Sequence, residues 1–319
     1  MELHGTMLEA HFKVFYASKK RNKVLRMLDM AATYLLKNRQ VDLVIIAVYS
    51  TLNFYYAWVM ALLCRILGTP YIAYLHGGNL PARLQHSPRM SSAIFNHSLA
   101  NVAPSGYLNA AFEQNGYQAR LIPNFIKLED YPFKERIQFR PRFLWVRSFE
   151  QTYHPEMTIR VFAEIQKKHP EAVLCMVGPD NDGSLKKCQQ LARELSIQKR
   201  VSFMGRLPKE AWVALATDYD IFISTTHFDN TPISVIEAMA LGLPVVSTNV
   251  GGIPYLLTQL QTGLLSPDND IPSMVENIQN LLASSDLAHT ISRNARLKAE
   301  SFDWKIVEEQ WLNLLNNNL

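Results

Sequence analysis

Short apolar runs alternate with longer amphipathic stretches along most of the chain. Apolar runs rich in β-branched and aromatic residues predict strands, whereas apolar positions spaced three and four apart predict helices. Strands that alternate with helices predict an α/β fold, with parallel sheets joined by right-handed crossovers. The predicted strands are 13–16, 43–48, 71–75, 143–146, 172–177, 201–203, 221–224 and 245–248, and the predicted helices are 23–37, 52–67, 106–115, 185–195, 232–241 and 302–315.

Residues 125–141 interrupt this alternation. Pro132, Pro141 and charges of both signs break the periodicity there, as they do at a domain boundary. The 319 residues are enough for two domains that each bury their own core. We therefore expect two doubly wound domains that face a cleft, over 1–136 and 137–300, and a final helix over 301–319.

Composition bears on partners and location. Hydrophobic residues make up 48% of the chain and the formal charge is only +4, so the chain is globular and nucleic acid is not an expected partner. Cys64, Cys175 and Cys188 lack the spacing of metal ligands and suggest a reducing compartment. Residues 1–10 lack the apolar core and cleavage site of a signal peptide, so we expect a cytoplasmic location.

Two segments bear on contact with a membrane. Residues 43–64 are apolar over about the length of a span, but polar residues near 50–53 interrupt them where a strand would turn into a helix. Basic residues near the start of the chain predict peripheral contact with anionic lipid or with a phosphorylated acceptor. The alternative is a solvated helix face, with Leu25 and Leu28 turned inward. The basic residues are Lys13, Lys19, Lys20, Arg21, Lys23 and Arg26.

Residues 218–254 form the unit around which the candidate chemistry gathers. A strand over 221–224 leads into a loop, and Thr231 then predicts an N-cap, with Pro232 as the first helical residue. The helix gives way to a second strand over 245–248. This order predicts a strand, a loop, a helix and a parallel strand, with the loop at the edge of the sheet where ligands collect.

Two acids frame the start of this helix. Asp229 lies in the loop, and Glu237 falls among apolar residues within the helix, where a carboxylate needs hydroxyl or charged partners. The first helical turn presents backbone amides, with a partial positive charge that suits a phosphate. The residues of this turn are Pro232, Ile233, Ser234 and Val235. The alternative is that both acids are solvated.

This stretch resembles the Glu-x7-Glu motif of the retaining, nucleotide-sugar-dependent glycosyltransferases of family four, which have the GT-B fold. Asp229 stands where the first Glu usually stands, and Pro232, Glu237-Ala238 and Gly251-Gly252 complete the motif. The resemblance implies that Asp229 contacts hydroxyls of the donor sugar and that Glu237 binds the nucleotide ribose. It also implies that the final helix crosses back onto the first domain. The amides near Gly251 and Gly252 are further candidates for phosphate contacts.

The loop after residues 71–75 reads His76-Gly77-Gly78. The glycines allow backbone to approach a ligand closely, and a histidine can serve as an acid, a base or a hydrogen-bonding group. Family members carry a histidine-containing loop here that lines the donor sugar, so the resemblance implies that role. A purely structural histidine is the alternative.

Arg147 directly follows the strand over 143–146 and resembles the family's phosphate-binding arginine. Its guanidinium suits bidentate contact with phosphate oxygens. The chain departs from the family pattern here, because Val146 replaces the usual glycine and His154-Pro155 replaces the usual Lys-Gly. His154 and Arg206 are weaker candidates for the second cation on the diphosphate, and Gly178, at the end of the next strand, is a further donor-binding candidate.

Asp180 and Asp182 match the Asp-x-Asp pattern that binds a divalent cation in the unrelated GT-A glycosyltransferases. Proline, asparagine, aspartate and glycine clustered after a strand are equally what a turn requires. We favour the turn, and no metal ligands are expected.

The resemblance covers nearly the whole chain but begins late. Family members open with a strand and a glycine-rich loop, whereas residues 1–5 correspond to positions after that loop and residues 13–16 to the second strand. Loss of the first strand would leave a parallel strand unpaired near the centre of the sheet.

The resemblance implies a hexosyltransferase of polysaccharide biosynthesis. The hexose would move from a nucleotide diphosphate sugar, its co-substrate, to a saccharide or lipid-linked acceptor with retention of configuration, without another cofactor. Arg147 and the helix N-terminus would hold the leaving diphosphate, while Asp229 and His76 orient the sugar. The alternatives are a catalytically inactive nucleotide-sugar-binding module of the same fold and, third, a metal-dependent GT-A enzyme.

Overall fold

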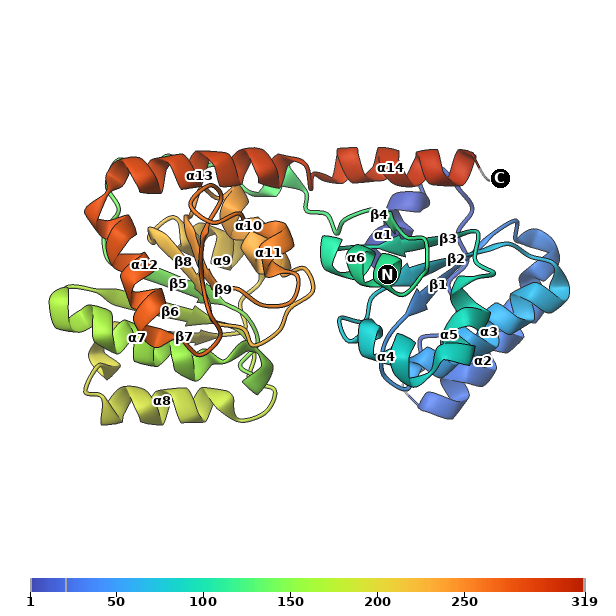
Figure 1. Cartoon of the computed structure of the whole chain (residues 1–319), viewed down its shortest axis with the longest axis horizontal. Coiled ribbons are helices and arrows are strands. Elements are labelled where there is room, and N and C mark those ends of the chain that lie inside the picture. Colours follow the sequence, from blue (N-terminus) through green and yellow to red (C-terminus); the bar gives the residue numbers. More distant parts are fainter. Residues whose placement is uncertain (1, 21, 318–319) are drawn as a thin grey trace. The chain divides into compact units, whose positions relative to one another are not determined.

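The computed structural model describes residues 2–20 and 22–317 and divides into two compact units (Figure 1). Unit 1 comprises Met1–Pro123 and Val307–Leu319, and unit 2 comprises Asn124–Ile306. Residues 124–136, which the sequence analysis assigns to the first domain, therefore belong to unit 2. The buried guanidinium of Arg136 holds them there, because it donates hydrogen bonds to the carbonyl oxygens of Tyr219 and Gly242, both 2.9 Å away.

Unit 2 is built on a six-stranded parallel sheet in the order β10-β9-β8-β5-β6-β7. Alternate residues of β5 point to opposite faces. Phe143 and Trp145 therefore join one core cluster with α7 (Pro155–Lys168) and α12 (Ile271–Ala283), while Leu144 joins another with α9 (Lys209–Ala216) and α10 (Ile233–Ala240). Both faces of this sheet are therefore covered by helices (Figure 1). The strands are β5 (Arg142–Val146), β6 (Val173–Val177), β7 (Val201–Gly205), β8 (Ile221–Ser224), β9 (Val245–Thr248) and β10 (Leu264–Ser266).

Among the helices of unit 2, those predicted over 185–195 and 232–241 are present, each within one residue of its predicted bounds, and the others were not predicted. The bounds of the unit 2 helices are α7 (Pro155–Lys168), α8 (Ser184–Glu194), α9 (Lys209–Ala216), α10 (Ile233–Ala240), α11 (Ile253–Leu256), α12 (Ile271–Ala283) and α13 (Ser285–Glu300), and the short 3-10 turns are η2 (Leu128–Asp130), η3 (Gln151–Tyr153) and η4 (Gln198–Arg200).

Unit 1 contains a smaller parallel sheet in the order β1-β2-β3-β4. The last helix, α14, begins in unit 2, and its later part packs in unit 1, where Trp311 meets Tyr74 at a ring distance of 5.2 Å. The strands are β1 (Val44–Val48), β2 (Tyr71–Leu75), β3 (Ala100–Ala103) and β4 (Arg120–Leu121), and the helices are α1 (Glu2–Leu8), α2 (Lys23–Lys37), α3 (Asn53–Leu67), α4 (Leu80–His86), α5 (Pro88–Phe95), α6 (Gly106–Gln114) and α14 (Trp304–Asn316), with a 3-10 turn η1 (Asn38–Gln40).

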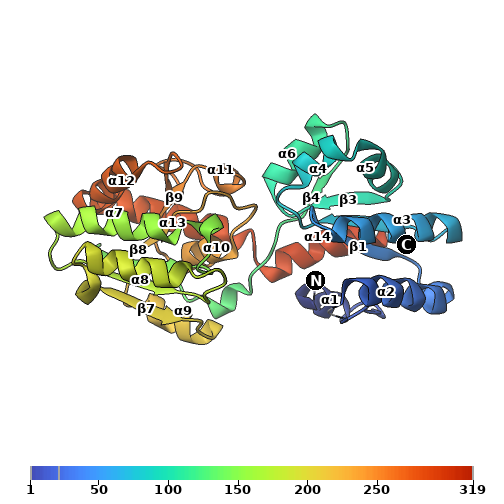
Figure 2. The same ribbon diagram turned by 90° about the horizontal axis from the view of Figure 1, so that it is seen from below.

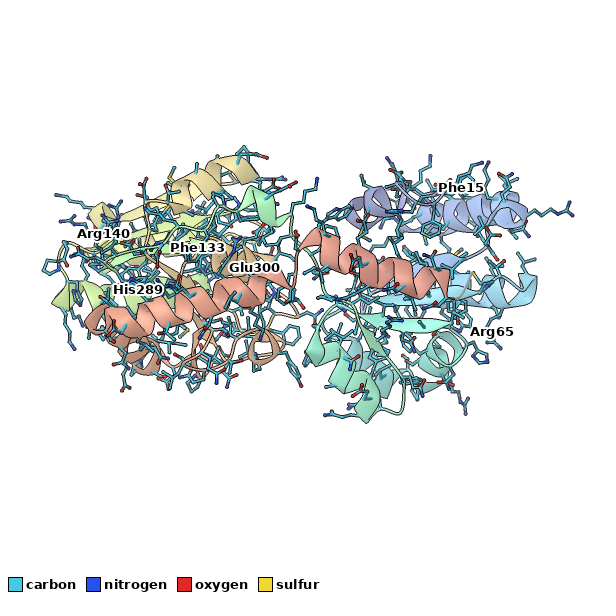
Figure 3. The ribbon with its side chains drawn as sticks, turned by 90° about the horizontal axis from the view of Figure 1, so that it is seen from above. Phe15, Arg65, Phe133, Arg140, His289 and Glu300 are labelled. Atoms are coloured by element: carbon cyan, nitrogen blue, oxygen red, sulfur yellow. The ribbon has the colours of Figure 1, made fainter. Side chains whose placement is uncertain are left out.

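The strand predicted over residues 13–16 is wrong. A strand needs a neighbour, and within the described residues β1 pairs only with β2. Residues 12–19 instead line a cavity of about 600 Å³ that also borders residues 40–47, at the free edge of β1. Phe15, labelled in Figure 3, lies between the ammonium groups of Lys13 and Lys37, which are 5.3 and 5.2 Å from its ring.

Helix α2 lies beside α3 (Figure 2), and several of its apolar side chains are in solvent. Leu25 is 55% exposed and Leu28 is 60% exposed, so the interpretation that turned these two side chains inward is wrong. Residues 43–64 form a strand and a helix, as predicted, and within the described residues we find no helix that is both long and apolar enough to cross a bilayer. Arg21 lies outside the described residues.

Candidate functional site

Arg147 and Asp229 form an ion pair where β5 and β8 end. The Nη2 group of Arg147 donates to a carboxylate oxygen of Asp229, and the guanidinium lies 4.3 Å from the ring centre of Tyr153. Both residues line a small cavity, of about 10 Å³, together with Pro232 and Ser234 at the start of α10. The structure thus brings a guanidinium, a carboxylate and a helix N-terminus together, an arrangement suited to an anion that carries a sugar.

The burial of this ion pair leaves the Arg147 guanidinium able to bind a phosphate. Asp229 is only 8% exposed, and burial raises the pKa of its carboxyl, although Arg147 opposes that rise. Nε of Arg147 is buried and has no hydrogen-bond partner within the described residues. A phosphate oxygen would satisfy this donor, since guanidinium groups prefer bidentate oxyanions.

Glu237 lies within α10 and has the partners that its apolar position requires. The hydroxyl group of Tyr131 donates to its carboxylate, and Nζ of Lys209 lies 4.0 Å away. The same ammonium group is 4.6 Å from the ring centre of Tyr131. Burial raises the pKa of Glu237, while Tyr131, Lys209 and Arg147 oppose that rise.

Sequence reasoning required such partners but did not find Tyr131 and Lys209. Tyr131 directly follows η2 and Lys209 is the first residue of α9, both far from Glu237 in sequence. Only the burial of the carboxylate signalled that a hydroxyl group and a cation must lie nearby.

The predicted start of α10 needs a small correction. Pro232 is the N-cap residue rather than the first helical residue, because its ψ of 110° is extended. The amide of Val235 donates to the Pro232 carbonyl at 3.1 Å, so that amide is already engaged. Ile233 and Ser234 remain the candidate amide donors of this turn.

Two predicted donor glycines lie beneath the site and shape it. A Cβ atom on Gly252 would lie 1.6 Å from the carbonyl oxygen of Asn230, and one on Gly178 would lie 1.7 Å from that of Arg147. The amide of Gly252 donates to the carbonyl of Asp229 at 2.7 Å. These glycines let the backbones that carry the ion pair approach closely. Gly251 precedes Gly252 in the same turn, and the side chain of Arg206 is exposed.

His76 lies in unit 1, in the loop after β2. Its ring packs against Tyr74 at 4.1 Å and stacks on Tyr49 at 5.3 Å. Burial lowers the pKa of His76 to about 4, so the imidazole is neutral at physiological pH. The amides of His76 and Gly77 both donate to the carbonyl of Val48, and Gly78 follows in the turn. This loop presents a neutral hydrogen-bonding side chain.

Asp180 and Asp182 serve the turn before α8. Asp180 accepts a hydrogen bond from the amide of Gly183 at 2.9 Å. Asp182 accepts from the amides of Ser184 at 3.0 Å and Gln151 at 2.8 Å, and the hydrogen bond from the Ser184 hydroxyl is the largest cause that lowers its pKa. The turn interpretation therefore explains these carboxylates.

Solved structures similar to this chain have its architecture. HepE of Anabaena, in complex with UDP, has a TM-score of 0.78 at 20% identity and covers 98% of this chain and 88% of its own. Sucrose-phosphate synthase of Thermosynechococcus elongatus has a TM-score of 0.78 at 19% identity, with coverage of 94% and 80%. The fold is GT-B, as expected, which rules out the GT-A interpretation of Asp180 and Asp182.

Curated relatives match about half of the chain. D-inositol 3-phosphate glycosyltransferase of Corynebacterium jeikeium is 28% identical over 179 residues, 54% of this chain and 43% of that protein. Spore coat protein SA of Bacillus subtilis is 26% identical over 183 residues, 55% of this chain and 48% of that protein. The matched part spans less than half of each relative. A family model described as "Glycosyl transferases group 1" matches residues 129–298, more than half of the chain. The chain belongs to this glycosyltransferase family.

Proposed function

We propose that this protein transfers a hexose from a nucleotide diphosphate sugar to a saccharide or lipid-linked acceptor, with retention of anomeric configuration. The observation that carries the proposal is the Arg147–Asp229 ion pair at the N-terminus of α10. A cation and a helix terminus stabilise the charge that develops on the leaving diphosphate. The carboxylate, kept in place by the cation, accepts hydrogen bonds from sugar hydroxyls.

The other predicted site residues take supporting roles. Glu237 accepts hydrogen bonds from the ribose hydroxyls, with Tyr131 and Lys209 fixing its orientation. His76, neutral at physiological pH, hydrogen-bonds the donor sugar. None of these roles needs a metal ion or a cofactor besides the donor itself.

UDP-sugars are the first donors to test. The HepE structures were solved with UDP and with UDP-glucose, and HepE shares the fold of this chain. GDP-sugars form the comparison set, because no side chain named above distinguishes the two bases.

The acceptor and the location are linked in this proposal. Helix α2 carries exposed apolar side chains, among them Leu25, Leu28 and Leu36, close to a cluster of basic residues. Such a helix can lie on an anionic surface, with its apolar groups between headgroups and its basic groups on phosphates. We place the protein in the cytoplasm, in peripheral contact with the membrane face where lipid-linked saccharides of polysaccharide biosynthesis are presented. Sedimentation with anionic and with neutral vesicles, using wild type and Leu25→Ser/Leu28→Ser, tests this contact.

Two variants test the site. Arg147→Ala removes the cation on the diphosphate, and we expect a loss of transfer of at least about a hundredfold, the scale of one lost electrostatic contact. Glu237→Gln keeps the size of the side chain but loses the ribose acceptor, so donor affinity should fall about tenfold or more. Glu135→Gln is the control, because Glu135 is exposed and pairs with Arg293, which has no role in the proposed site. Wild-type turnover in both site variants would refute the assignment, and the anomeric configuration of the product, read by NMR, tests retention.

The alternative is an inactive module that only binds nucleotide sugars. A sheet edge that borders a cavity in unit 1 favours it, since the acceptor side of such a protein would be incomplete. Calorimetry with UDP- and GDP-sugars, paired with an assay of donor hydrolysis, separates the two. Binding without hydrolysis or transfer to any saccharide acceptor would select the module.

A further inference from the structure

Three side chains outside the Arg147–Asp229 pair come together in unit 2, and one of them, His154, is also a weaker sequence candidate for a cation on the diphosphate. His154 directly precedes α7, His227 lies in the loop that also carries Asp229, and Asp268 follows β10. One ligand atom from each lies within 4.8 Å of the other two. Nδ1 of His227 is 2.9 Å from a carboxylate oxygen of Asp268, and the rings of His154 and His227 stack at 4.1 Å.

Main-chain contacts fix the segments that carry these groups. The amide of His227 donates to the carbonyl of Thr152 at 2.9 Å, and the hydroxyl of Thr225 donates to the carbonyl of His154 at 2.8 Å. The loop after β8 and the turn before α7 are therefore joined on both sides of the histidine pair. These contacts fix the two histidines relative to each other, and the exposed side chain of Asp268 approaches them from the end of β10.

One nitrogen atom of the cluster is buried without a hydrogen-bond partner among the described residues. This atom is Nδ1 of His154. A buried imidazole nitrogen without a partner is destabilising, and structures resolve such cases with a water molecule or an ion. We propose that His154, His227 and Asp268 form a binding site for one divalent transition-metal ion, with Zn²⁺ as the expected occupant.

The donor set selects the class of ion. Neutral imidazole and carboxylate ligands suit Zn²⁺, Co²⁺ and Ni²⁺, whereas Mg²⁺ and Ca²⁺ prefer sets made of oxygen. Bonds of about 2.0–2.2 Å to a tetrahedral ion place ligand atoms about 3.4 Å apart. The observed separations are 2.9 Å for one pair and at most 4.8 Å for the others. The ligand atoms are therefore close enough for side-chain rotations to bring them to the spacing of a bound ion.

Such an ion would join three segments at the carboxyl edge of the sheet. It would tie the loop of Asp229 to the start of α7 and to the end of β10, and three protein ligands would leave a fourth position open to water. The ion is therefore a positioning element for the loop and not a participant in transfer. Binding of the ion does not require that the protein transfers sugar, so the two proposals fail separately.

The test uses the full chain, freed of metal by EDTA and dialysis, without any donor. Titration with Co²⁺ should give visible d–d bands that saturate at one ion per chain, and Zn²⁺ should abolish them while Mg²⁺ does not. Zn²⁺ should also raise the melting temperature, because a ligand that binds only the folded state stabilises it. Absence of the bands in the wild type, or equal competition by Mg²⁺, would overturn the proposal.

Variants locate the ion. His227→Ala and Asp268→Ala should each weaken Co²⁺ binding at least about a hundredfold, more than loss of a supporting contact. His154→Asn should do the same while it keeps a residue that tolerates the left-handed backbone found there, where φ is +42°. His169→Ala is the control, since that histidine contacts Gln279 outside the cluster. Circular dichroism establishes that each variant is folded, and bands that persist unchanged in all three would refute the site.

Discussion

Both units contain a parallel sheet packed against helices, but they differ in how completely the sheet is covered. In unit 2 six strands pair in parallel, and core clusters cover both faces, with Trp145 and Leu144 buried on opposite sides. In unit 1 the sheet has four strands, and its edge strand β1 borders a cavity of about 600 Å³. Exposed apolar side chains also gather on α2 and α3 of unit 1.

This difference predicts which of the two units resists local opening better. A closed, densely packed core resists local opening, whereas an uncovered edge strand beside a cavity lacks both backbone partners and packing contacts. We therefore expect unit 2 to hold the rigid candidate donor site and unit 1 to open first. Hydrogen exchange resolved by mass spectrometry can follow the two units separately in the same sample.

The largest expected effect is on the stability of unit 2, when the buried side chain of Arg136 is removed. The Arg136 side chain is 2% exposed, pairs with Asp220 at 3.4 Å and donates to carbonyl oxygens that include those of Ala216 and Leu241. Arg136→Ala removes these contacts and leaves buried carbonyl groups unpaired, so the free energy of unfolding of unit 2 should fall by about 3–5 kcal/mol. Urea melts with exchange mapping over β8 and α10 measure it.

The control for this prediction is Arg140→Ala. Arg140 pairs with the same Asp220 at 2.8 Å, but half of its side chain is in solvent, so its loss should cost about 1 kcal/mol or less. If the two substitutions lowered the free energy of unfolding equally, the burial of Arg136 would not be what holds residues 124–136 in unit 2.

A second, smaller effect concerns unit 1 and pH. Burial lowers the pKa of His76 to about 4 in the folded chain, against about 6.5 when unfolded. As pH falls, the unfolded chain takes up the proton first, so the stability gained from the neutral ring is complete above about pH 6.5. It is lost between about pH 6.5 and 4, by roughly 3 kcal/mol in all. Exchange rates of β2 peptides across this pH range measure the loss.

Replacing the ring removes that dependence. His76→Phe keeps an aromatic side chain between Tyr49 and Tyr74 but cannot take up a proton, so exchange in β2 should become flatter with pH. His97→Gln changes an exposed histidine of the same unit and should leave the wild-type slope. A slope that survives in His76→Phe would assign it to other groups.

The strands were predicted best where apolar β-branched runs end at turn residues. Residues 71–75, 221–224 and 245–248 are β2, β8 and β9 with the predicted bounds, because buried parallel strands need such runs whatever surrounds them. Residues 13–16 have the same local pattern and still form no strand. Pairing is a property of the partner strand, which the local sequence does not contain.

In the candidate site, too, the local sequence predicted some residues and missed those that tertiary packing brings in. Arg147 and Asp229 were named from their places after β5 and β8, and the fold brings them into contact. The partners of Glu237, Tyr131 and Lys209, were missed because their approach depends on how residues 124–136 return to unit 2. Local pattern predicts which groups end a strand, and tertiary packing decides which distant groups meet them.

The smallest expected effect is a change in stability that has opposite signs in the two units when an alanine is replaced by leucine. Ala57 on α3 lines the cavity of unit 1, whereas Ala192 on α8 is fully buried in a closed core of unit 2. Alanine and leucine both favour helices, so replacing either alanine by leucine tests mainly the space around it. Ala57→Leu can place its added methyl and methylene groups in the cavity and should stabilise unit 1 by about 1 kcal/mol. Ala192→Leu must push neighbours apart and should destabilise unit 2 by about 1–3 kcal/mol. Urea melts with exchange mapping give both values, and destabilisation of similar size at the two positions would show that unit 1 is packed as densely as unit 2.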